Sequence, residues 1–121
     1  MKMTRTALLG LHGSRDLVSS MQERFEAKGY ITELVETPAE MLACATTNVY
    51  DRYFMDLNLG NSNSPDITSA VTIYDLVRAR VEAGKAKFLG ISGNIKAVVI
   101  ARERNIPAEI KGLYDLAAFL E

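Results

Sequence analysis

Short apolar runs alternate along this chain with segments in which apolar residues recur every three or four positions. A short apolar run bounded by turn-forming residues predicts a buried strand, whereas the longer spacing predicts an amphipathic helix. The predicted strands are 6–11, 31–35, 52–57, 87–92 and 108–110. A predicted helix follows each strand: from 17 to the stop at Gly29, from 38 through 45, from 67 to the stop at Gly84, from 95 to 104, and to 120 from a cap at Asp115.

Five repeats of strand and helix predict a parallel sheet with helices on both faces, because parallel strands need long crossovers and these are right-handed. The second predicted strand is more polar than the first and the fifth is short, so both suit the edges of the sheet. These features fit the flavodoxin-like α/β fold, a doubly wound (βα)5 parallel sheet with strand order 2-1-3-4-5. We expect residues 1–121 to form one such domain.

A carboxylate, Asp56, interrupts the apolar run that forms the third predicted strand. Because burying an unpaired charge is costly, we expect Asp56 at the open end of the sheet, facing a cation, a phosphoryl group or water. Two later predicted strands run into Ser92 and Lys111. Ligands of doubly wound sheets bind outside the carboxyl ends of the strands. An acid, a hydroxyl and an ammonium at this edge are the groups that a phosphoryl-accepting site needs.

The composition excludes several classes of protein. Fourteen basic and fifteen acidic side chains give a formal net charge of −1, which offers no electrostatic basis for nucleic acid or a membrane surface as a partner. Cys44 is the only cysteine, so we expect no internal disulfide, no cysteine-based zinc cluster and a cytoplasmic location. No apolar stretch approaches the roughly 20 residues of a membrane span.

Four short motifs occur in the same order as in a known family. They are Gly29-Tyr30 after the first predicted helix, the segment 55–59 (Met-Asp-Leu-Asn-Leu), Ser92-Gly93 after the fourth strand, and Ile110-Lys111 before the last helix. On five strand–helix units, this order resembles the receiver domain of two-component response regulators. The resemblance covers essentially the whole chain. It implies a stand-alone receiver-like signalling domain that acts in a phosphorelay and is not itself an enzyme.

By this resemblance, Asp56 would accept a phosphoryl group from a histidine kinase or a phosphotransfer protein and pass the signal to a downstream protein. Lys111 would pair with the acyl phosphate, and Ser92 would donate a hydrogen bond to a phosphoryl oxygen. Asp56 and the backbone carbonyl of Asn58 would hold Mg²⁺. A metal ion and an ammonium would neutralise the charge that develops on the transferring group.

The chain departs from the family at the metal site and at the switch. Receiver domains place two acidic residues after the first strand, where this chain has His12-Gly13. Mg²⁺ prefers carboxylate and water oxygens, so we expect impaired Mg²⁺-dependent phosphorylation, unless Asp16 substitutes. The position of the aromatic switch residue is Ala108, and Gly112 stands where a proline is common. The polar loop 61–65 borders the predicted site, as a flexible connection or as a lid.

Three interpretations remain open at this point. The first is a working phospho-acceptor in a phosphorelay. The second is a pseudo-receiver, a protein-interaction module that acts without phosphorylation. The third is a flavodoxin-like small-molecule-binding protein, which ranks last because the chain has no glycine-rich phosphate motif and no nucleophile–base pair. Whatever the function, the position of Lys111 opposite Asp56 predicts an ion pair between them. His12, the only histidine, is expected to be satisfied by backbone groups rather than to bind a metal, with pH sensing as a minor alternative.

Overall fold

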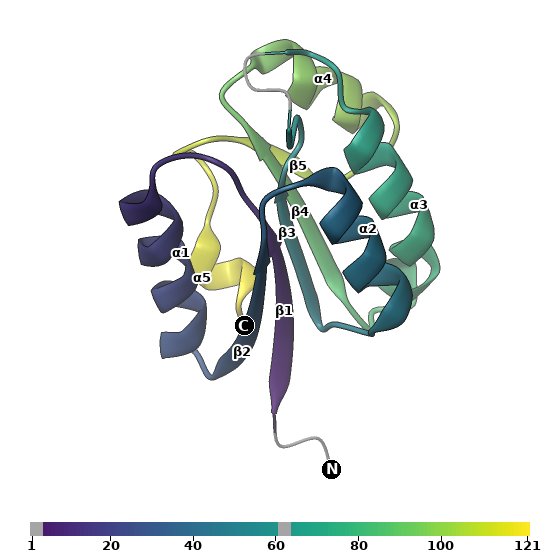
Figure 1. Cartoon of the computed structure of the whole chain (residues 1–121). Coiled ribbons are helices and arrows are strands. Elements are labelled where there is room, and N and C mark those ends of the chain that lie inside the picture. Colours follow the sequence, from purple (N-terminus) through teal and green to yellow (C-terminus); the bar gives the residue numbers. More distant parts are fainter. Residues whose placement is uncertain (1–3, 61–63) are drawn as a thin grey trace.

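The protein is described by a computed structural model that covers residues 4–60 and 64–121 as alternating strands and helices (Figure 1). The strands are β1 (Arg5–Gly10), β2 (Tyr30–Val35), β3 (Arg52–Asp56), β4 (Lys87–Ser92) and β5 (Ala108–Ile110). The helices are α1 (Arg15–Ala27), α2 (Pro38–Thr47), α3 (Thr68–Glu82), α4 (Ile95–Glu103) and α5 (Leu116–Phe119). The polar loop at 61–65 lies partly outside the described residues, so its predicted role as a lid stays a prediction.

The five strands form one parallel sheet in the order β2-β1-β3-β4-β5, which confirms the predicted flavodoxin-like topology. Helices α1 and α5 cover one face of the sheet, and α2, α3 and α4 cover the other (Figure 1). All strands point the same way, so their carboxyl ends meet at one edge. No helix in the described part of the chain is long and apolar enough to cross a membrane.

Each face of the sheet has its own apolar core. On the α1–α5 face, Phe25 and Phe54 pack with ring centroids 5.5 Å apart. On the other face, Met41 of α2 is fully buried and its sulfur lies where a side chain on Gly10 would have to go, at 2.2 Å from the ideal Cβ position. Gly10 therefore allows α2 to approach β1 closely, beside the edge where the strands end.

Most predicted elements begin or end one or two residues away from their bounds in the structure. Strand β1 ends at Gly10 rather than at residue 11, but the Leu11 amide still donates to the Val35 carbonyl at 3.1 Å. Helix α1 begins at Arg15 rather than at residue 17, because Ser14 caps it by accepting from the Leu17 amide. The apolar pattern missed this polar first turn. The bounds of β4 and β5 are as predicted.

Strand β3 carries a buried charge at each end. At its amino end Arg52 is 8% exposed, and its guanidinium donates to three backbone carbonyls, those of Asp51 (2.9 Å), Phe119 (2.7 Å) and Glu121 (2.6 Å). The guanidinium also lies over the rings of Tyr30 and Phe119. Arg52 thereby fixes the segment that follows α5. Asp56, at the carboxyl end of the same strand, is 1% exposed.

Candidate functional site

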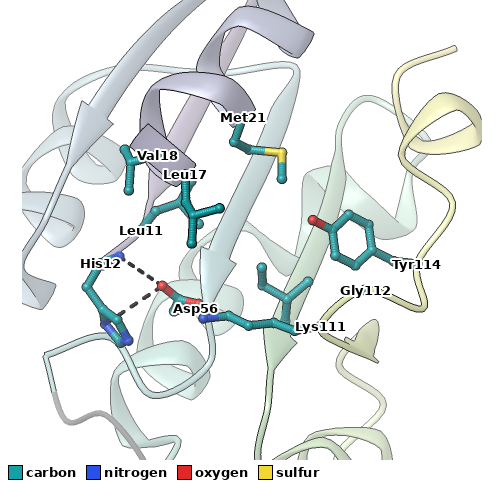
Figure 2. A pocket seen from close by; sticks show the side chains of 10 residues that line it. Leu11, His12, Leu17, Val18, Met21, Asp56, Lys111, Gly112 and Tyr114 are labelled. Atoms are coloured by element: carbon teal, nitrogen blue, oxygen red, sulfur yellow. Dashed lines mark hydrogen bonds and ion pairs between the residues drawn. The ribbon is translucent and has the colours of Figure 1, made fainter. Parts of the chain in front are cut away.

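Three strand ends bring charged groups together at the carboxyl edge of the sheet (Figure 2). Asp56 is the last residue of β3, Lys111 directly follows β5, and His12 lies two residues after β1. The ammonium Nζ of Lys111 lies 3.1 Å from Oδ1 of Asp56, and the His12 ring atom Nδ1 lies 3.7 Å from Oδ2. The predicted ion pair between Asp56 and Lys111 is therefore present.

The turn after β1 places His12 beside the carboxylate. Gly13 has φ of 133°, a conformation that side-chain-bearing residues rarely adopt, so the chain turns sharply before the cap at Ser14. In this turn the backbone N–H of His12 donates to Oδ2 of Asp56 at 2.9 Å. The carboxylate is thus held by one backbone donor and by a charge contact to Lys111 that lacks the alignment of a hydrogen bond.

The partners of Asp56 are far more exposed than Asp56 itself. The carboxylate is 1% exposed, whereas the side chains of Lys111 and His12 are 45% and 23% exposed. A buried carboxylate without a partner would cost several kcal/mol, so the Lys111 ammonium is the cation that compensates its charge. Because Lys111 and His12 both reach solvent, they can move without breaking the core.

Two hollows open at this edge of the sheet in the described part of the chain, and Asp56 lines the first of them. The first has a volume of about 210 Å³ and is mostly apolar (Figure 2); it is lined by Leu11, His12, Leu17, Val18, Met21, Asp56, Ile91, Lys111, Gly112 and Tyr114. The second is polar, with a volume of about 610 Å³, and is lined by His12, Gly13, Leu17, Asn58, Gly93, Asn94 and Lys111. His12, Leu17 and Lys111 line both hollows, so the two share a wall made by the side-chain partners of Asp56 and by Leu17.

Solved structures with the same architecture include receiver domains. The receiver domain of a sensor histidine kinase from Pseudomonas aeruginosa, solved with magnesium in its active-site cleft, has a TM-score of 0.64 and 18% identity, over 97% of this chain and 94% of its own. A response regulator from Burkholderia pseudomallei, solved with a phosphorylated aspartic acid and a calcium ion, has a TM-score of 0.69 and 17% identity, over 97% of this chain and 64% of its own. A CheY-like receiver domain from Methylobacillus flagellatus has a TM-score of 0.62 and 22% identity, over 94% and 91% of the two chains.

This chain has the receiver-domain fold. No protein-family model matches its sequence, and no curated protein matches it. The likeness therefore lies in the fold, and the chemistry of this receiver-like chain has to be derived from its own residues.

Two predicted site residues of the receiver fold have other contacts. Ser92 is fully buried, its hydroxyl accepts from the Asn94 amide at 3.0 Å, and it lines neither hollow. Asn58 is 7% exposed and lines the polar hollow, and its side-chain amide donates to the Ser64 carbonyl at 3.0 Å. In this structure Ser92 stabilises the turn into α4. Its predicted contact with a phosphoryl oxygen, and the metal contact of Asn58, stay predictions.

The acidic residues do not fit a magnesium site of the usual receiver type. In residues 4–60 and 64–121, no group of three or more His, Cys, Asp or Glu side chains is placed to hold a metal ion. Asp16, the predicted substitute, is exposed at the start of α1 and lines neither hollow. Among the residues that the structure describes, Asp56 is the one carboxylate that lines either hollow. Mg²⁺ prefers several oxygen ligands and keeps the rest of its shell as water.

The sequence analysis missed the apolar hollow and Tyr114. Val18 and Met21 of α1 are half-buried and line the hollow. Tyr114 follows Lys111 by three residues, and its ring packs on Phe54 at a centroid distance of 5.6 Å. Burial raises the pKa of the Tyr114 hydroxyl; the negative charge of Asp56 raises it further, against the lowering effect of Arg24. An aromatic residue so close to the predicted site lysine was the available signal.

Proposed function

We propose that this protein is a receiver-like signalling domain that works through protein contact, with Asp56 as a phospho-acceptor whose Mg²⁺-dependent phosphorylation is impaired. One observation carries the proposal: Asp56 lies between Lys111 and the His12 backbone N–H, at the place where receiver domains hold metal, without a second carboxylate lining the described hollows. The single cysteine fits a reducing compartment, so we place the protein in the cytoplasm.

The arrangement supplies part of what phosphoryl transfer needs. In the transfer, an Asp56 oxygen forms a bond to phosphorus as the bond from phosphorus to the donor nitrogen breaks, and the donor nitrogen takes up a proton. The Lys111 ammonium at 3.1 Å neutralises charge on the transferring group. Because no second carboxylate lines the described hollows to help hold a metal ion, Lys111 would supply most of the charge neutralisation. We therefore expect slow transfer. We propose a histidine kinase or a phosphotransfer protein as the donor.

A second candidate function is docking that does not depend on phosphorylation. Three large apolar side chains at the rim of the site are strongly exposed: Leu17 and Leu113 at 72% and Ile95 at 63%. They come from three different segments, α1, the stretch after β5 and the start of α4. In addition, the buried residue at the switch position is Ala108, so no aromatic ring can swing there. We propose that a kinase, phosphotransfer or downstream protein binds this rim.

Phosphoramidate treatment followed by intact-mass analysis tests the proposed acceptor. The wild type is expected to gain a single phosphoryl group slowly, and Asp56→Asn to gain none. Modification that persists in Asp56→Asn would show that another residue is the acceptor. A complete lack of modification would leave docking as the function. Docking is then tested by comparing a partner's affinity for wild type and Leu113→Asp, with Leu76→Asp, an exposed position on α3, as the matched control.

A further inference from the structure

His12 and Asp56 are spaced as two ligands of one metal ion. Zn²⁺ binds imidazole nitrogen and carboxylate oxygen at about 2.0–2.2 Å, so two such donors on one ion lie about 3 to 4 Å apart. The His12 Nδ1 and Asp56 Oδ2 atoms are 3.7 Å apart. The His12 ring and the Asp56 carboxylate face each other in the lining of the first hollow (Figure 2). Binding therefore requires only a small adjustment of the two side chains.

The carboxylate is oriented for such a site by its other contacts. The His12 backbone N–H holds Oδ2 at 2.9 Å, and Lys111 lies against the other oxygen, Oδ1. Among the described residues, Oδ2 accepts one hydrogen bond, from the His12 N–H, and so has a lone pair for a metal ion. A hydrogen bond to a ligating carboxylate is the outer contact that typically fixes its orientation in metal sites.

The donor set decides which metals suit the site. A histidine nitrogen with one carboxylate oxygen suits Zn²⁺, Ni²⁺ or Co²⁺, whereas Mg²⁺ prefers oxygen ligands alone. The polar hollow, which Asn58 and Asn94 also line, offers space for water in the remaining coordination positions. Receiver domains have an acidic residue at the position of His12. A histidine there removes an oxygen ligand for Mg²⁺ and also supplies a nitrogen ligand that favours a different metal ion.

We propose that His12 and Asp56 bind a borderline divalent metal ion of the Zn²⁺ class in preference to Mg²⁺. The ion is held by Nδ1 of His12, with the ring proton on Nε2, and by Oδ2 of Asp56, and water completes its shell. With two protein ligands the ion exchanges readily. This inference goes beyond the proposed function, because binding requires neither phosphorylation nor a partner.

The single histidine gives a direct test in the intact, untagged protein. Because His12 is the only histidine, its ring signals in an NMR spectrum report on coordination without ambiguity. Zn²⁺ is expected to shift these signals saturably, together with the Asp56 amide, and Mg²⁺ at the same concentrations to leave them unchanged. Zn²⁺ shifts that never saturate, or a Mg²⁺ response as strong as that to Zn²⁺, would overturn the proposal.

Variants separate this site from other zinc ligands. Asp56→Asn keeps an acceptor for the His12 N–H but removes the anionic ligand, so we expect Zn²⁺ affinity to fall at least about tenfold. Cys44→Ser should bind as the wild type does, and a loss there would assign the metal to the thiol. His12→Asp should bind Mg²⁺ more tightly than the wild type. The wild-type titration decides the question even if a variant fails to fold, and it is independent of whether Asp56 is phosphorylated.

Discussion

The two ends of strand β3 bury opposite charges in different ways. Arg52 is enclosed: its described hydrogen-bond acceptors are main-chain oxygens, and two aromatic rings lie against it. Asp56 is more deeply buried, but Lys111 and His12, its side-chain partners, both reach solvent beside the two hollows. A charge saturated by backbone cannot exchange partners without local unfolding. A charge held by solvent-exposed side chains can exchange its partners, and this property suits a binding site.

The largest expected effect is at the enclosed end. Arg52→Met removes the guanidinium that donates to the main-chain oxygens of Phe119 and Glu121, whereas the Asp51 carbonyl keeps the Lys87 amide as a donor; we expect a loss of about 3 kcal/mol in the free energy of unfolding. Urea denaturation measures it. Arg52→Lys, the control, keeps the charge but not the forked geometry and should recover only part of the loss. A loss below about 1 kcal/mol for Arg52→Met would contradict the structural role.

The next effect is at the open end. Lys111→Met leaves the buried Asp56 charge with the His12 N–H as its described hydrogen-bond donor, and we expect a loss of about 2 kcal/mol, reduced because Lys111 is half exposed. Adding Asp56→Asn should restore most of the stability, since the unpaired charge is then gone. If the double variant is less stable than Lys111→Met, the two residues do not compensate each other.

A smaller effect is expected for Asp56→Asn alone. The Lys111 ammonium that loses its partner is already half exposed and becomes solvated, so the loss should stay below about 1 kcal/mol. A smaller loss in the free energy of unfolding for Asp56→Asn than for Lys111→Met would show that stability does not require the Asp56 charge. Urea denaturation of both variants at the same pH measures it. Equal losses for Asp56→Asn and Arg52→Met would remove the contrast between the two ends of β3.

The smallest effect links Asp56 to Tyr114. Burial raises the Tyr114 pKa above its ordinary value of 10.0, and the Asp56 charge adds to this, so Asp56→Asn should lower it. Because the folded pKa is raised, neutral Tyr114 stabilises the fold below the unfolded pKa, and this contribution is lost as pH rises through the folded pKa. Alkaline titration of tyrosinate absorbance, with Tyr114→Phe to identify the signal, measures the shift. An unchanged Tyr114 titration would show that the two groups do not interact.

The fold could be predicted from the sequence because the strand and helix patterns are local and repeat along the chain. Alternating strand and helix patterns predicted the parallel sheet, and the polar second strand and short fifth strand predicted the edges. Asp56 and Lys111 were found because a charge at the end of an apolar run is conspicuous, and the order of strands brings them together.

The other features of the site depend on backbone atoms and on packing, which residue types alone do not predict. The His12 N–H that holds Asp56 is a backbone atom, and the turn at Gly13 determines where it points. The apolar hollow arises because α1 and the segment around Tyr114 meet without filling the space between them, which helical spacing alone does not reveal. The contact of Ser92 with the Asn94 amide is equally a product of one local turn.

The central claim is that the open end of β3 lacks the ligands for Mg²⁺, and the rate of Asp56 phosphorylation by phosphoramidate with and without Mg²⁺ tests it most directly. His12→Asp is the matched variant, because it adds a carboxylate beside Asp56 and leaves Gly13 in its left-handed conformation. We predict that Mg²⁺ changes the wild-type rate by less than about tenfold and stimulates His12→Asp more strongly. Stimulation of the wild type beyond about tenfold, equal to that of the variant, would contradict the account.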